Sequence, residues 1–199
     1  MAVPCKFPIE LVTAFADTQN GWVTCQPIPA MIEYAQDLRS ERDKLWPDIY
    51  PEEDGDMKWT GELGELCVIA WLRSLGIAGK WHKGNPIDKP DVTTDDKSVR
   101  IGVKTVKRQV RMQEDYTAQI SAKHRNENAD WFFFLCYEQP WNQMVLLGAI
   151  KPADFLRTAK FYRAGQWVHP NYQVRGHDIY NGDVTPFIRP RKWADSNCI

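Results

Sequence analysis

The stretch TGELGELCVIAWLRSLG at residues 60–76, followed by KPDVTT at 89–94 and VRIGVKTV at 99–106, decides the fold of this chain. The first segment has apolar residues at nearly every third or fourth position, which predicts an amphipathic helix. Thr60 suits the N-cap of this helix, and Gly76 suits its C-terminal end. The next two segments are short, apolar and bounded by turn formers, which predicts strands packed against the helix.

The flanking sequence extends this pattern in both directions. TAQISA (117–122), DWFFFLCYE (130–138) and QMVLLGAI (143–150) predict further strands, and WVHPNYQV (167–174) predicts a last strand before a proline-rich end. KPADFLRTAKFY (151–162) predicts a short helix, and residues 30–45 predict a longer one. WPDIYPEEDGDMK (46–58) predicts an acidic loop rich in helix breakers. We therefore expect an α/β fold with a central mixed β-sheet flanked by helices.

The domain organisation follows from length and from where the pattern begins. A chain of 199 residues fits one domain of ordinary size. Residues 1–56 are expected to form an N-terminal helical extension, and residues 57–199 the α/β domain, together in one compact unit. The sequence contains no internal repeat, low-complexity segment or linker.

Composition narrows the class of protein. Hydrophobic residues make up 43% and charged residues 26%, which favours a packed core over disorder. The net charge of −1 argues against a passive DNA-coating protein, but not against an enzyme that meets DNA on one local patch. No apolar run is long enough to span a bilayer, and the five scattered cysteines argue against a zinc ribbon or a disulfide scaffold. We expect a cytoplasmic protein without a membrane partner, and expect most of its nine tryptophans to pack in or against the core.

Two carboxylates and a lysine within this segment indicate a chemistry. Glu62 and Glu65 are three residues apart on one helix and so share a face. Asp91 begins one predicted strand, and Lys104 lies within the next. Carboxylates suit Mg²⁺, which activates water for phosphodiester hydrolysis, and a nearby lysine neutralises the charge that develops on phosphate. Because strand side chains alternate, Val103 points away from Lys104 into the core, which leaves its carbonyl free to face a metal.

Each of these residues also has a structural interpretation. Glu62 and Glu65 could simply be first-turn acids that stabilise a helix N-terminus. Asp91 could be a turn acid after Pro90, and Lys104 could be a solvated strand residue, although its neighbours are apolar. Their occurrence together is what favours a site.

The series GELGELCV, KPDV and IGVKT resembles the PD-(D/E)xK nuclease superfamily, and the likeness continues through ADWFFFLCYEQPWNQMVLLGAIKPADF to NYQV, over residues 60–174. The resemblance implies a restriction-endonuclease-like core and a DNA substrate. It also implies an Mg²⁺ cofactor for which Mn²⁺ can substitute, in a bacterial or phage-infected cell. It assigns catalytic roles to Glu65, Asp91 and Lys104, with metal ligands from Asp91, Glu65 and the carbonyl of Val103.

The chain departs from this family at Gly102, where members usually have Asp or Glu. Either another acid replaces the missing ligand, or metal affinity is weak, or catalysis is lost. The candidate acids are Glu62, Asp88, Asp95 and Asp96, and Glu62 is favoured because it shares a helix face with Glu65.

Basic residues follow the predicted lysine strand. Lys107, Arg108 and Arg111 are candidate DNA-binding residues, although a solvated strand end explains them equally well. On a continuous strand, Lys104 and Arg108 share one face while Lys107 and Arg111 share the other. The helix at 30–45 could be a contact in a homodimer or a lid over a DNA groove.

Three functional hypotheses remain at this stage. The first is a metal-dependent nuclease that hydrolyses DNA, of repair, recombination or restriction type. The second is a catalytically inactive protein of the same fold that serves DNA binding or assembly, which Gly102 favours. The third is an unrelated α/β domain whose tryptophans form a protein-binding surface.

Overall fold

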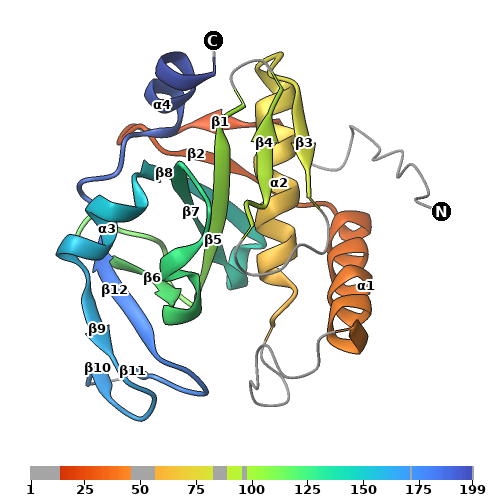
Figure 1. Cartoon of the computed structure of the whole chain (residues 1–199). Coiled ribbons are helices and arrows are strands. Elements are labelled where there is room, and N and C mark those ends of the chain that lie inside the picture. The colour runs from red at the N-terminus through yellow and green to blue at the C-terminus, as the bar shows by residue number, and fades with distance from the viewer. Residues whose placement is uncertain (1–13, 46–56, 83–88, 96–97, 171, 199) are drawn as a thin grey trace.

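The central feature of the computed structural model, which describes residues 14–45, 57–82, 89–95, 98–170 and 172–198, is a seven-stranded sheet in the order β1-β2-β8-β7-β5-β4-β3 (Figure 1). The β5–β7 pair is parallel and the other neighbouring pairs are antiparallel, so the sheet is mixed. The predicted α/β fold with a central mixed sheet is confirmed. The strands are β1 (Ala16–Asp17), β2 (Val23–Cys25), β3 (Gly79–Trp81), β4 (Val92–Thr94), β5 (Arg100–Arg108), β7 (Trp131–Glu138) and β8 (Gln143–Ile150).

Helices cover one face of this sheet. These are α1 (Pro29–Leu45), α2 (Thr60–Ser74) and α4 (Pro190–Asn197). Their side chains, including Leu38, Leu66 and Trp193, form one buried cluster with Phe133 and Leu135 of β7. Figure 1 shows α2 lying along β5 and β4, with α1 beside it.

The other face is covered by α3 (Pro152–Thr158) and a second, three-stranded sheet. That sheet has the order β6-β12-β9, with β6 (Thr117–Ser121), β12 (Ile179–Asp183) and β9 (Lys160–Tyr162). Phe132 and Phe134 of β7 pack here against Phe155 of α3. Because both faces of β7 are covered, the run DWFFFLCYE is continuously apolar rather than alternating. The remaining elements are β10 (Trp167–His169), β11 (Tyr172–Gln173) and two short 3₁₀ turns, η1 (Ala122–Asn126) and η2 (Gln139–Trp141).

The central helix matches its prediction closely, with a change at its N-terminus. Trp59 occupies the N-cap position, and the Thr60 hydroxyl donates to the Met57 carbonyl instead of capping the helix. The prediction of Thr60 as N-cap is therefore wrong by one residue. Gly76 follows the helix with a φ of 76°, a left-handed conformation that suits glycine.

Gly64 explains how α2 approaches the sheet. A Cβ atom built on Gly64 would overlap the Thr105 hydroxyl of β5. Only glycine allows this close approach. It seats α2 directly on β5 and so sets the position of Glu65, the next residue.

The two ends of the chain differ from the prediction. The N-terminal segment supplies the strands β1 and β2 as well as the helix α1. Strand β2 joins the main sheet by pairing with β8. At the other end, the predicted last strand is replaced by two short strands, β10 (Trp167–His169) and β11 (Tyr172–Gln173), which pair antiparallel. That prediction is wrong, because β12 and α4 follow it. Pro190 begins α4, where a missing N–H is tolerated. Most of the predicted acidic loop, residues 46–56, lies outside the described residues.

Tryptophans lie mainly in or against the core, as predicted. Two are exposed, Trp141 and Trp167. The other six of the eight within the described residues are buried or half-buried: Trp22, Trp59, Trp71, Trp81, Trp131 and Trp193. In the part of the chain that the structure describes, no helix is long and apolar enough to cross a membrane.

Candidate active site

Asp91 lies where β4 and β5 separate. The two strands pair at Val92–Ile101 and Thr93–Arg100, and the Asp91 N–H still donates to the Ile101 carbonyl. Two residues further along β5, the Val103 N–H donates to Asp91 Oδ2 at 2.7 Å. A strand N–H that has lost its ladder partner needs an acceptor, and this carboxylate supplies it. The contacts of Asp91 with described residues use Oδ2, which leaves Oδ1 for a ligand.

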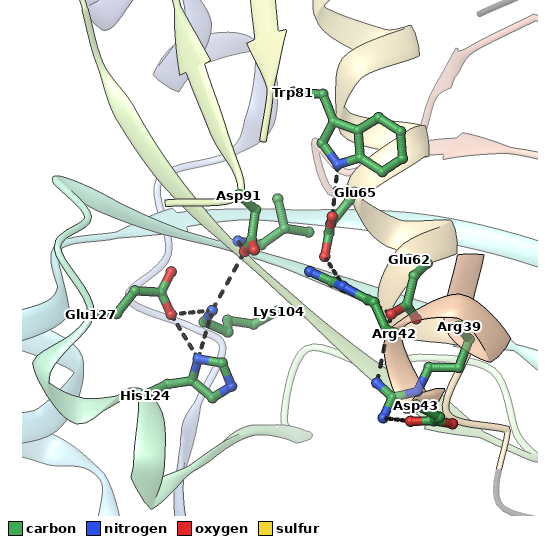
Figure 2. A network of polar contacts seen from close by, with 11 residues as sticks. Arg39, Arg42, Asp43, Glu62, Glu65, Trp81, Asp91, Lys104, His124 and Glu127 are labelled. Atoms are coloured by element: carbon green, nitrogen blue, oxygen red, sulfur yellow. Dashed lines mark hydrogen bonds and ion pairs between the residues drawn. The ribbon is translucent and has the colours of Figure 1, made fainter. Parts of the chain in front are cut away.

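A group that we call the lysine cluster (Asp91, Lys104, His124 and Glu127) gathers on one side of β5 (Figure 2). Lys104 Nζ lies 2.6 Å from Glu127 Oε2, 3.7 Å from Asp91 Oδ2 and 3.5 Å from His124 Nδ1. His124 Nδ1 lies 2.8 Å from the same Glu127 oxygen. The Lys104 side chain is 6% exposed and that of Glu127 1% exposed. Lys104 is therefore a buried, paired ammonium and not a solvated strand residue.

The charged groups of this cluster shift one another's pKa values. Burial raises the pKa of Asp91, against the pull of Lys104 and with a push from Glu127. Burial also acts to raise the pKa of Glu127, but Lys104 and His124 outweigh it, so that pKa lies below the ordinary value. Burial and the Lys104 charge lower the pKa of His124. Lys104 and His124 therefore favour the carboxylate form of Glu127, while burial and Lys104 disfavour the protonated form of His124.

A second group, the arginine cluster (Arg39, Arg42, Glu62, Glu65 and Trp81), lies on the α2 side of the site. Arg42 of α1 donates to Glu62 Oε1 at 2.7 Å and to Glu65 Oε1 at 3.2 Å. Arg39 lies 3.6 Å from Glu62, and the Trp81 indole N–H donates to Glu65 Oε2 at 2.7 Å. Figure 2 shows both oxygens of Glu65 held in this way. Sequence reasoning missed Arg42 and Trp81, because both reach the site from distant elements.

The two clusters meet electrostatically at Asp91. Burial and then the Asp91 charge raise the pKa of Glu65 to about 8, against the pull of Arg42. Burial alone would lower the pKa of Arg42, but Glu65 and Glu62 raise it above its usual range. Glu65 and Asp91 are therefore close enough for one carboxylate to resist ionisation of the other. All three residues predicted to be catalytic lie together.

Gly102 lies beside Lys104 on the same face of β5, two residues before it. A Cβ atom built on Gly102 would overlap Glu127 Oε1. This oxygen is buried and has no hydrogen-bond partner among the described residues. Glu127 was not among the acids predicted to replace the one missing at Gly102. It lies in a loop without periodicity or motif, and the gap at Gly102 was the one signal for it.

The predicted substitutes for that acid lie elsewhere. Glu62 lies against Arg39 and Arg42, and Asp95 is an exposed residue whose N–H donates to the Ala78 carbonyl. Asp88 and Asp96 fall outside the described residues.

The predicted DNA-binding residues lie at and beyond the end of β5. Arg108 donates to the Thr117 carbonyl, and its guanidinium lies 4.9 Å from the Tyr116 ring centre. Arg111 pairs with Glu138 at 2.6 Å and lies over an exposed tryptophan ring. Lys107 is half-buried on the opposite face of β5 from Arg108. Both arginines are thus held by neighbours within the chain, and DNA binding by the three residues stays a prediction.

The donor set suits a hard cation with few protein ligands. Within the described ranges, no three His, Cys, Asp or Glu side chains are grouped so as to hold a metal ion. The lysine cluster offers two carboxylates, and Mg²⁺ is usually held by one or two together with water and substrate oxygens. The residues present therefore fit Mg²⁺.

Comparison with known proteins does not identify the function of this chain. No protein-family profile and no curated protein matches this chain. Among solved structures, it is similar to a bacterial homing endonuclease, I-Ssp6803I, at 15% identity and a TM-score of 0.37, over 70% of this chain and 86% of that one. A likeness at that level carries no argument about activity. The mixed sheet and its flanking helices define an α/β fold.

Proposed function

We propose that this chain is a metal-dependent nuclease that hydrolyses DNA phosphodiester bonds with Mg²⁺ as its cofactor. The observation that supports it most is the ammonium of Lys104, buried within 4 Å of two carboxylates, one of which is fixed by the backbone of β5. A buried lysine among carboxylates, at the point where two strands separate, is suited to a phosphate group.

Asp91 is the first metal ligand in this proposal, through Oδ1. Val103 is the second, because the N–H and C=O of a strand residue point to the same side, and its N–H points to Asp91. Glu65 lies next to Asp91, but both of its oxygens already accept hydrogen bonds from Arg42 and Trp81, so it supports the site rather than binding the cation. When bound, the cation polarises the phosphoryl oxygen and lowers the pKa of water.

Lys104 has the role of orienting the attacking water and neutralising charge on the phosphate. Its ammonium is already positioned by Glu127 and Asp91, so little reorganisation is needed during the reaction. Arg42 and Trp81 hold the Glu65 carboxylate in one orientation. Since Lys104 is buried, water has restricted access, and its interaction with substrate is stronger than in solvent.

One observation favours a second function. Gly102 lacks the acid that the PD-(D/E)xK family usually places there, which is what a catalytically inactive protein used for DNA binding or assembly would show. The two functions differ in whether DNA is cut.

Incubation with supercoiled plasmid and with single-stranded DNA, in Mg²⁺, Mn²⁺ or EDTA, tests the proposal. We expect cleavage that needs the metal and falls at least about 100-fold in Lys104→Ala. Lys192→Ala, an exposed lysine on α4, serves as the matched control and should cut like the wild type. Cleavage that persists in EDTA or in Lys104→Ala contradicts the proposal. DNA binding without cleavage by the wild type supports the inactive alternative.

A further inference from the structure

The lysine cluster contains an acid that no sequence pattern assigns. Glu127 lies just after η1, yet its carboxylate reaches the face of β5 that carries Gly102 and Lys104. It does so from 25 residues further along the chain than Gly102.

The space at Gly102 and the carboxylate of Glu127 fit each other. A side chain at position 102 would project beside Lys104, and the overlap of a Gly102 Cβ with Glu127 Oε1 means that this oxygen occupies that space. With Glu127 in this position, any side chain at 102 would displace its carboxylate. The chain has its acid in the expected place, but supplies it from another segment.

The two oxygens of Glu127 have different surroundings. Oε2 is within hydrogen-bond distance of both Lys104 Nζ and His124 Nδ1. Oε1 has no partner among the described residues, although the side chain is 1% exposed. An unpaired buried carboxylate oxygen is unfavourable unless a ligand uses it. Glu127 and Asp91 both contact the Lys104 ammonium through their other oxygens, so the two carboxylates belong to one cluster.

Glu62 also has a buried oxygen without a partner, Oε2. Its other oxygen, however, lies within 4 Å of two guanidinium groups, those of Arg39 and Arg42, which repel a cation. Glu127 has one ammonium and the His124 imidazole next to it, and it shares the ammonium with Asp91. The geometry thus favours Glu127 over Glu62 as the replacement.

We infer that Glu127 is the second carboxylate ligand of the divalent cation bound by Asp91, in place of the acid absent at Gly102. The inference rests on the proposed function for the presence of the cation, and it names a ligand that the sequence pattern does not.

Mn²⁺ titration of the DNA-free full-length chain, followed by electron paramagnetic resonance, tests this assignment without any activity measurement. We expect Glu127→Gln to weaken Mn²⁺ binding at least about tenfold and Glu62→Gln, the matched change in another buried glutamate, to alter it less than about twofold. Unfolding curves by circular dichroism establish that each variant is folded.

A relocated acid provides the stronger test. Glu127→Ala opens the space, and aspartate has its carboxyl group directly on Cβ, so Gly102→Asp would return a carboxylate to nearly the same place. We expect the Gly102→Asp/Glu127→Ala double variant to bind Mn²⁺ within about threefold of the wild type. This comparison holds even if Glu127→Ala alone fails to fold.

The outcomes separate the two proposals. The inference is overturned if Glu127→Gln binds Mn²⁺ as the wild type does, or if Glu62→Gln loses more Mn²⁺ affinity than Glu127→Gln. It is also overturned if the double variant binds Mn²⁺ no better than Glu127→Gln, or if the wild type binds no Mn²⁺ at millimolar concentration. Mn²⁺ binding that needs Asp91 and Glu127 in a protein that never cuts DNA contradicts the nuclease and leaves this site standing. DNA cleavage that is unchanged in Glu127→Gln contradicts this metal site and leaves the nuclease proposal standing.

Discussion

The lysine cluster and the arginine cluster lie on opposite sides of β5, and both pair buried carboxylates with cations (Figure 2). They differ in how the acid nearest Asp91 is held. In the arginine cluster, each oxygen of Glu65 accepts a hydrogen bond. In the lysine cluster, Glu127 keeps one oxygen without a partner among the described residues, and the contacts of Asp91 with those residues use only one of its two oxygens.

This difference indicates a structural role for the arginine cluster and a ligand-binding role for the lysine cluster. The arginine cluster joins α1 to α2 and holds Glu65 in one orientation, which is the role of a structural network. Within the part of the chain that the structure describes, the lysine cluster presents unpaired carboxylate oxygens near a positioned ammonium, which is the role of a site that receives a ligand. Substitutions in the two clusters should therefore differ in whether they affect activity or stability.

Asp91→Asn should have the largest effect on activity, because Asp91 belongs to the lysine cluster and also acts on Glu65. An amide oxygen can still accept from the Val103 N–H, so the fold should persist. We expect single-turnover DNA cleavage to fall at least about 1,000-fold, since both metal binding and charge compensation are lost. Asp154→Asn, an acid on α3 whose side chain is 51% exposed, is the control. Retention of more than a tenth of the wild-type rate would remove Asp91 from the site.

Arg42→Gln should chiefly reduce stability. It leaves the buried acids Glu62 and Glu65 without their nearest cation, which we expect to lower the free energy of unfolding by about 2–4 kcal/mol. Chemical denaturation measures this change, and Lys44→Gln, exposed in the last turn of the same helix, should differ little. Cleavage by the folded fraction should fall less than about tenfold. A stable Arg42→Gln protein with abolished cleavage would instead make Arg42 part of the chemistry.

Glu65→Gln should alter stability in a pH-dependent way. The folded-state pKa of Glu65, about 8, is raised above that of an unfolded glutamate, so its stabilising contribution is complete below the unfolded pKa and is lost as pH rises through 8. Glutamine does not ionise. We therefore expect the variant to gain at least about 1 kcal/mol over the wild type between pH 5 and pH 8.5. Thermal unfolding at both pH values gives this difference, and a gap that stays constant or shrinks would contradict the raised pKa.

Trp81→Phe should have the smallest effect. It removes the donor to Glu65 Oε2 and keeps an aromatic ring, and we expect a loss of about 1 kcal/mol of stability. Arg42 still holds the other oxygen of Glu65, so cleavage should change by less than about fivefold. Trp167→Phe, on an exposed ring, is the control. A loss of cleavage comparable to that of Asp91→Asn would place Trp81 at the centre of the chemistry.

The sequence predicted those parts of the molecule that a local pattern of residues specifies. The helix at 60–76 and the strand that carries Lys104 have clear periodicity, and Asp91 and Lys104 belong to short local motifs. The C-terminal helix α4 was missed because its eight residues begin with a proline and include few apolar side chains. Strand β3 was missed because its three residues are too few to show a periodic pattern.

The partners of the site residues were not predictable in this way. Arg42 reaches Glu65 from a helix 23 residues earlier, and Glu127 reaches Lys104 from a loop 23 residues later. Neither contact leaves a periodic trace in the sequence. Gly102 is the informative exception, because an unexpected glycine marked the space that Glu127 fills.

Anomalous diffraction from crystals of the protein soaked in Mn²⁺ tests the central claim most directly. A divalent cation bound at the lysine cluster predicts one strong peak within ligand distance of both Asp91 and Glu127. A peak beside Glu62 and away from Glu127, or no peak at Asp91 in a protein whose DNA cleavage requires Mn²⁺, would contradict the account.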